Sequence, residues 1–268
     1  MTFTYRIIFS VFLSTLNITL MAQDNSPIGH QEIIYKTVDN DDLLLHVFSP
    51  KSLSSPAPLT VFLHPGGWIM GSPASFFDDC KKYALLGHVS VSVEYKLANF
   101  TSRSPMDCLD DVIVALKFLH EHSEELKADM SKLSIVGYSA GAHLALMSQL
   151  VSDLDVPIAH RLILYSTPVD LRDDKLAPQL IKRDETLASI SPITYLRKIP
   201  SEIYMFHGGK DFMVSVDHAK VFAERSEKIG NSILLDISED ANHFLLTGDA
   251  KDNIHMRTME ILFPNRIK

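Results

Sequence analysis

Short runs of apolar, often β-branched residues alternate with longer segments of helical periodicity along most of this chain. Such alternation is typical of parallel βαβ units. The later runs are apolar throughout, as expected of strands that are covered on both faces. We expect strands at residues 32–38, 43–48, 59–64, 89–95, 133–137, 162–166, 203–207 and 233–237.

Helical patterns fill the intervals between these runs, at residues 75–86, 106–122, 140–151, 215–228 and 247–262. The first two strands are separated only by residues 39–42, so we expect them to pair in antiparallel fashion. Residues 169–200 carry many charges and little periodicity, and we interpret them as a surface excursion with one short helix. The sequence therefore predicts an α/β fold: a mostly parallel, doubly wound, eight-stranded sheet with helices on both faces and no large cap domain.

The N-terminal segment is typical of a secretory signal peptide. Arg6 precedes a mostly apolar run to Met21, and Ala22 stands before a polar stretch. The run is short and rich in Ser, Thr and Asn, which argues against a membrane span. We therefore expect a signal peptide at residues 1–22, a single domain at residues 23–268, and a secreted or periplasmic protein. A buried N-terminal element is the alternative.

Composition and charge exclude several classes of partner. The 268 residues are 46% hydrophobic and carry a formal net charge of -8 without any basic run, so neither nucleic acid nor an anionic membrane is expected as a partner. The twelve histidines show no metal-ligand spacing, and we predict no metal and no cofactor. Cys80 and Cys108 are equally compatible with a disulfide and with two buried thiols. The oligomeric state stays open.

Residues 137–141, Gly-Tyr-Ser-Ala-Gly, carry the strongest chemical signal. They lie between an expected strand and an expected helix, where a sharp turn holds the central serine in a strained conformation and exposes its hydroxyl. The flanking glycines leave room for that turn. We predict Ser139 as a nucleophile; the alternative is a structural serine in a tight turn.

A serine hydroxyl needs a base, and the base needs an orienting acid. Asp211 follows the strand at 203–207, and His243 follows the strand at 233–237. Because parallel strands end at one edge of a sheet, both side chains are expected to meet Ser139 there. Asp217 is the weaker candidate for the acid, since it falls within the next expected helix.

Residues 64–68, His-Pro-Gly-Gly-Trp, form a glycine-rich loop after the strand at 59–64. The backbone N–H groups of Gly66 and Gly67, together with that of Ala140, are predicted to form an oxyanion hole. A plain turn is the alternative for this loop. We expect His143, four residues after the serine, to be a packed histidine rather than a catalytic one.

Several motifs in this order resemble the α/β-hydrolase esterases, in particular the compact bacterial feruloyl- and acetyl-esterase-like group related to the hormone-sensitive-lipase-like carboxylesterases. The resemblance extends from residue 32 to the C-terminus and implies the same triad and oxyanion residues. Two positions depart from the family pattern: Pro65 replaces a glycine of the usual His-Gly-Gly-Gly, and Ala142 replaces the second glycine after the serine. The motifs are found at residues 64–68, 94–97, 137–141, 191–192, 207–211 and 243–244.

The predicted function is a serine carboxylesterase that acts on short-chain or aryl esters through an acyl-enzyme. Acetyl or feruloyl groups on polysaccharides are the substrates that the resemblance and the expected secretion favour. A serine peptidase or an arylformamidase on the same fold remains an alternative. The first normally carries a gating domain that is absent here, and secretion counts against the second. An inactive binding protein that keeps the hydrolase scaffold is the alternative from another class.

Overall fold

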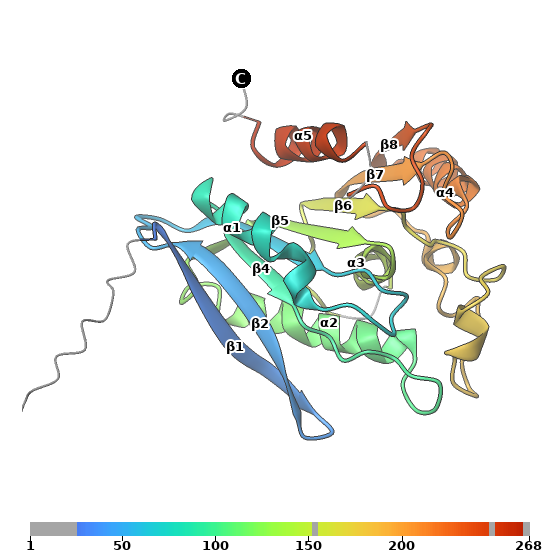
Figure 1. Ribbon diagram of the computed structural model, residues 1–268, viewed down its shortest axis with the longest axis horizontal. Helices are drawn as coiled ribbons and strands as arrows, with labels where there is room; N and C mark the ends of the chain where they lie inside the picture. The colour runs from blue at the N-terminus through green and yellow to red at the C-terminus, as the bar shows by residue number, and fades with distance from the viewer. Residues whose placement is uncertain (1–25, 152–154, 247–249, 265–268) are drawn as a thin grey trace, which may run out of the picture.

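Eight strands of the described residues form a single mixed sheet in the order β1-β2-β4-β3-β5-β6-β7-β8 (Figure 1). The structure is a computed structural model that describes residues 26–151, 155–246 and 250–264, so the expected signal peptide lies outside the described residues. The strands are β1 (Ile28–Val38), β2 (Asp41–Pro50), β3 (Ala57–Leu63), β4 (Val89–Val93), β5 (Ala128–Tyr138), β6 (Arg161–Tyr165), β7 (Glu202–Gly208) and β8 (Ser232–Ser238).

The first two strands form a long antiparallel hairpin at one side of the sheet, as predicted (Figure 1). The turn between them consists of Asp39 and Asn40, with φ of 51° and 66°. Positive φ at both central residues is the geometry of the tight turns that match strand twist, and Asp and Asn tolerate it better than most residues. β2 then pairs with β4, also in antiparallel fashion.

From β4 onward the six remaining strands run parallel. The central ones are buried on both faces, which explains why their sequences are apolar without alternation. Because the strands are parallel, the loops after β3, β5, β7 and β8 leave the sheet at the same edge. That edge is where an open α/β sheet places its ligand crevice.

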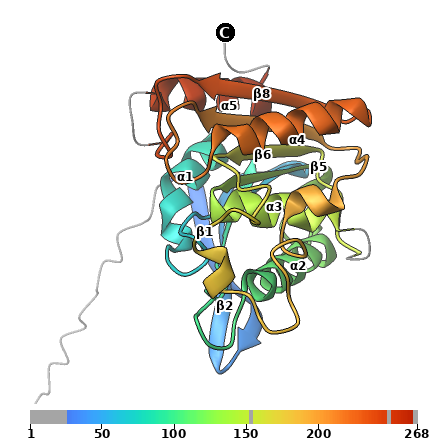
Figure 2. The same ribbon diagram turned by 90° about the vertical axis from the view of Figure 1, so that its right-hand side faces the viewer.

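Helices cover both faces of the sheet (Figures 1 and 2). One face packs against α2 (Pro105–Glu121), α3 (Ala140–Leu150) and α4 (Val216–Lys228), and the other against α1 (Phe77–Leu85) and α5 (Lys251–Leu262). Each face of the sheet therefore has its own hydrophobic core. Successive residues of β3 point to opposite faces, so that Val61 belongs to the core under α2, α3 and α4, and Phe62 to the core under α1 and α5. Cys80 and Cys108 lie in different cores and are both free buried thiols, which resolves the open question of a disulfide.

The helices differ from the expected ones mainly at their ends. The segment at 75–86 begins with a 3-10 turn, Pro73–Phe76, before α1 starts at Phe77. The last expected helix begins at Lys251, and residues 247–249 are outside the described part of the chain. The excursion after β6 contains two short 3-10 helices, Ala177–Gln179 and Pro192–Tyr195, rather than one. Within the described ranges, no helix has both the length and the apolar character needed to cross a bilayer.

Candidate active site

Ser139 lies between the last residue of β5 and the first residue of α3, in a strained backbone conformation with φ of 53° and ψ of -116°. A positive φ is rare for a residue with a side chain, and such strain is typical of functional turns. A Cβ on Gly137 would lie 2.5 Å from the carbonyl oxygen of Gly141. One on Gly141 would lie 2.0 Å from the carbonyl oxygen of Leu63. The two glycines are therefore required by close backbone approach, as the motif predicts.

The structure brings the three predicted triad residues together. His243 Nε2 lies 3.1 Å from Ser139 Oγ, and His243 Nδ1 lies 2.8 Å from Asp211 Oδ2. The histidine is 4% exposed and the serine 8% exposed, so this chain of hydrogen bonds is largely shielded from water. Both distances allow proton transfer from the serine to a histidine whose orientation is fixed by the aspartate.

The Asp211 carboxylate is buried, and both of its oxygens have hydrogen-bond partners. Its Oδ1 accepts hydrogen bonds from the backbone N–H groups of Met213 (2.9 Å) and Val214 (2.8 Å). His207 Nε2 lies 3.3 Å from Oδ2, the oxygen that also faces His243. Burial raises the pKa of Asp211, but the hydrogen bonds from these neighbours outweigh it and hold the pKa well below its ordinary value. Asp211 is therefore an anion at neutral pH.

The backbone of His243 is fixed by two hydroxyl groups that the sequence analysis did not identify. Tyr138 Oη donates to the carbonyl oxygen of His243 at 2.6 Å, and Ser166 Oγ donates to the same oxygen at 3.1 Å. Tyr138 is the residue between Gly137 and Ser139 in the serine motif, so its place beside the nucleophile could be seen in the sequence. Its hydrogen bond to His243 could not. Ser166 follows β6 directly and carried no signal.

The glycine loop after β3 reaches the same place. β3 pairs directly with β5, so the residues after Leu63 lie beside the serine turn. Gly66 and Gly67 have φ of 133° and 58°, and the carbonyl of Gly66 accepts a hydrogen bond from the N–H of Met70 at 3.0 Å. Ala140 is the first residue of α3, where backbone N–H groups lack an intrahelical acceptor. The end of β3, from which the glycine loop leaves, thus contacts the start of α3 at Gly141, and the oxyanion role of Gly66, Gly67 and Ala140 stays a prediction.

His143 is a packed residue, in agreement with the expectation from sequence. It is fully buried; Trp68 Nε1 donates to its Nδ1 at 3.2 Å, and its own Nε2 donates to the carbonyl of Ile190 at 2.7 Å. The side chain therefore ties the glycine loop and the excursion after β6 to the serine helix. Burial lowers the pKa of His143 to about 4, so the imidazole is neutral.

Aromatic side chains flank the triad. Phe244 contacts His243 edge to face at 5.8 Å, and Phe212 lies 6.0 Å from Phe244 while remaining 71% exposed. A hollow of about 670 Å³ lies between α1 and α5, and Tyr138 and Phe244 form part of its wall. Six of its lining residues are Phe or Tyr, which suits an aromatic group, and five others are Asp or Lys side chains of α1 and α5.

Comparison with known proteins relates this geometry to esterases. The BD-FAE family model (bifunctional feruloyl/acetyl esterase) matches residues 45–162. Esterase LipC of Mycobacterium tuberculosis is 25% identical over 221 residues, which cover 72% of this chain and 54% of LipC. Carboxylesterase NlhH of the same species is 31% identical over 130 residues, 47% of this chain and 40% of NlhH. The chain thus spans about half the length of these curated relatives.

Solved structures agree with the described fold. The apo form of Thermogutta terrifontis esterase 2 is 29% identical and superposes with a TM-score of 0.78. The superposition covers 87% of this chain and 92% of the esterase. The butyrate-bound form is 28% identical, with a TM-score of 0.76 over 87% and 91% of the two chains. Fold and site together define an α/β hydrolase. Within that class, the chain is similar to the BD-FAE family over residues 45–162, and to esterase LipC, carboxylesterase NlhH and Thermogutta terrifontis esterase 2.

Proposed function

We propose that this protein is a serine carboxylesterase that hydrolyses short-chain or aryl esters through a covalent acyl-enzyme. The observation that carries the proposal is the continuous hydrogen-bonded chain from Ser139 through His243 to Asp211, with distances of 3.1 and 2.8 Å. The strained turn under the serine and the buried, ionised aspartate are the features that such a nucleophile needs.

Acylation begins when His243 Nε2 takes the proton of Ser139 and the serine oxygen attacks the ester carbonyl. The negative charge on the carbonyl oxygen is met by the N–H groups of the glycine loop and of Ala140. The tetrahedral intermediate collapses when the histidine gives its proton to the departing alcohol, which leaves an acyl group on the serine. Asp211 keeps the imidazole in the tautomer that this step requires.

Deacylation repeats the same steps with water. His243 accepts a proton from a water molecule, and the hydroxide attacks the acyl carbonyl. The second intermediate expels the serine oxygen, which recovers its proton from the histidine. The products are a carboxylic acid and an alcohol, and the enzyme returns to its starting state.

Two observations support the proposed range of acyl groups. Thermogutta terrifontis esterase 2 was solved with butyrate and with propionate, which supports short acyl chains. The six Phe and Tyr side chains in the wall of the hollow beside Phe244 support aryl acyl groups, and the BD-FAE match supports feruloyl and acetyl esters. Polysaccharide side chains that carry these esters are the natural substrates we propose. The proposal includes export, supported by the signal pattern at residues 1–22.

The test is a panel of p-nitrophenyl acetate, butyrate and decanoate together with methyl ferulate. We expect turnover of the short-chain and feruloyl esters, and a loss of about 10⁴-fold or more in kcat for Ser139→Ala. Ser131→Ala, an exposed change on the same strand, serves as the matched control and should leave turnover unchanged. Turnover by Ser139→Ala at the wild-type rate would refute the mechanism, and inactivity of the wild type on every ester would refute the function.

A further inference from the structure

Three side chains able to bind a metal converge on the outer hairpin of the sheet, away from the triad. His30 and Glu32 are two residues apart on β1 and therefore point to the same face. His46 on β2 is the direct cross-strand partner of Glu32. The three residues lie on the face that packs against α1, and Phe77 of that helix contacts both imidazole rings.

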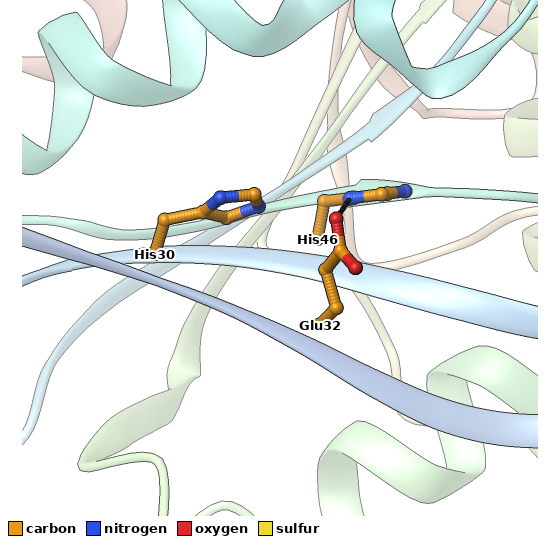
Figure 3. A group of neighbouring side chains, drawn as sticks. All are labelled: His30, Glu32 and His46. Carbon is orange, nitrogen blue, oxygen red and sulfur yellow. Dashed lines mark ion pairs between the residues drawn. The ribbon is translucent and has the colours of Figure 1, made fainter.

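The ligand atoms of this cluster are close and face one another. One atom from each side chain lies within 4.8 Å of the others, and Glu32 Oε1 is 3.4 Å from His46 Nδ1. Figure 3 shows a ring nitrogen of His30 directed toward the gap that the other two residues border. Two imidazoles and one carboxylate form a donor set that zinc commonly takes, with water in the fourth position.

The buried ligand atom of the cluster, His46 Nδ1, lacks a hydrogen-bond partner in the described part of the chain. His46 is 7% exposed, and its Nδ1 is buried without a hydrogen-bond partner among the described residues. The 3.4 Å separation from the Glu32 carboxylate exceeds the ordinary N–H···O distance of about 2.9 Å. A buried ring nitrogen without a partner is unfavourable, and a cation between it and the carboxylate would satisfy both groups.

Neighbouring aromatic rings hold the two imidazoles in place. His30 stacks on Phe48 with ring centroids 4.2 Å apart and planes 7° apart, and His46 packs against Phe77 at 4.8 Å. The His30 and Glu32 side chains are exposed, whereas His46 is buried.

We propose that His30, Glu32 and His46 form a zinc site that fastens the edge strand β1 to β2. The site is separate from the triad, because β4 and β3 lie between the hairpin of β1 and β2 and the strand β5 that leads to Ser139. Its role is therefore structural. The spacing of the histidines along the sequence did not indicate a metal site, because the third ligand, His46, comes from the opposite strand of the hairpin.

The test is calorimetric titration of zinc chloride into the untagged protein after removal of metals by chelation. We expect one zinc per chain with a Kd of about 10 µM or tighter, and a rise in Tm of about 3 °C when zinc is in excess. His30→Ala and Glu32→Gln should each weaken binding at least about tenfold. Both positions are exposed, so these variants should match the wild-type Tm in chelator, which shows that the fold is intact.

His120→Ala is the matched control, since His120 is an exposed histidine on α2 and is not part of the cluster, and the variant should bind zinc as the wild type does. Wild-type binding weaker than the stated Kd, or a loss smaller than tenfold in either ligand variant, would overturn the proposal. Because the readouts are binding and Tm, the result is independent of whether the protein hydrolyses esters.

Discussion

Tyr138 Oη donates a hydrogen bond of 2.6 Å to the carbonyl oxygen of His243, 105 residues later in the chain. The residue that precedes the nucleophile therefore positions the base. Ser139 and His243 come from different loops, and a contact between these loops keeps Oγ and Nε2 at a distance that permits proton transfer. The aromatic ring of Tyr138 also forms part of the wall of the adjoining hollow.

Replacing Tyr138 by Phe should lower kcat about tenfold and leave KM nearly unchanged, because the ring stays while the hydroxyl that positions His243 is lost. Ser166 still donates to the same carbonyl, so the loop that carries His243 keeps one of its two hydrogen bonds. The free energy of unfolding should fall by about 1 kcal/mol. Steady-state kinetics on p-nitrophenyl butyrate checks this prediction. Tyr204→Phe, which removes a hydroxyl bonded to Glu202, is the control with expected wild-type kcat.

Asp211→Asn should reduce kcat by about 10³–10⁴ with little change in the fold. The substitution removes the negative charge and presents an amide to His243, which no longer favours the tautomer needed for proton transfer. Asp217→Asn, an exposed change on α4, is the matched control for the same chemistry. If Asp217→Asn were the damaging change and Asp211→Asn the silent one, the identity of the acid would be wrong.

Gly67→Ala should reduce kcat by one to two orders of magnitude, about 2–3 kcal/mol of barrier, if the loop forms the oxyanion hole. Gly67 has φ of 58°, which strains any residue with a Cβ, and an added Cβ would lie 3.0 Å from Leu176 Cδ2, so the Leu176 side chain or the loop must give way slightly. Gly230→Ala is the control: its φ of 84° imposes a similar backbone cost of about 1 kcal/mol, but its surroundings are open and far from the triad. Equal kcat in the two variants would contradict the assignment.

Stability should decrease as the pH falls from about 6.5 toward 4. Burial lowers the pKa of both His64 and His143 to about 4 from the ordinary 6.5. Between these values the unfolded chain binds more protons than the folded one, so the stabilisation is complete above pH 6.5 and is lost on acidification. Urea titrations at pH 7 and pH 5 should differ by up to about 2 kcal/mol for each histidine.

His143→Gln should flatten this pH dependence, because it removes one of the two buried groups that must take up a proton. His120→Gln, at an exposed position, should leave the slope unchanged. An unaltered slope in His143→Gln would mean that His143 is not the neutral, buried group described above.

The positions of the strands along the chain and the convergence of the triad residues at one edge could be predicted, because they follow from local patterns. Ser139 is marked by its glycines, and Asp211 and His243 follow strands whose ends must share one edge. Contacts that join distant segments could not be predicted in this way. The bond from Tyr138 to His243 depends on how two loops pack, and no periodicity encodes it.

The boundaries show the same limit. The 3-10 helix at Pro73–Phe76 continues the apolar pattern of α1. The pattern therefore predicts a single helix, whereas the backbone forms a 3-10 helix followed by an α-helix. The cluster of His30, Glu32 and His46 depends on the register of the hairpin, in which Glu32 faces His46. A one-residue shift would place that histidine on the other face, and register is not visible in linear spacing.

Covalent labelling with a fluorophosphonate tests most directly whether Ser139 is an activated nucleophile. The folded protein should take up one label per chain, and peptide mass spectrometry should locate it on Ser139. Labelling should be lost in Ser139→Ala and be much slower in Asp211→Asn, while Ser131→Ala labels as the wild type does. A folded wild-type protein that stays unlabelled, or that carries the label on another residue, would contradict the account.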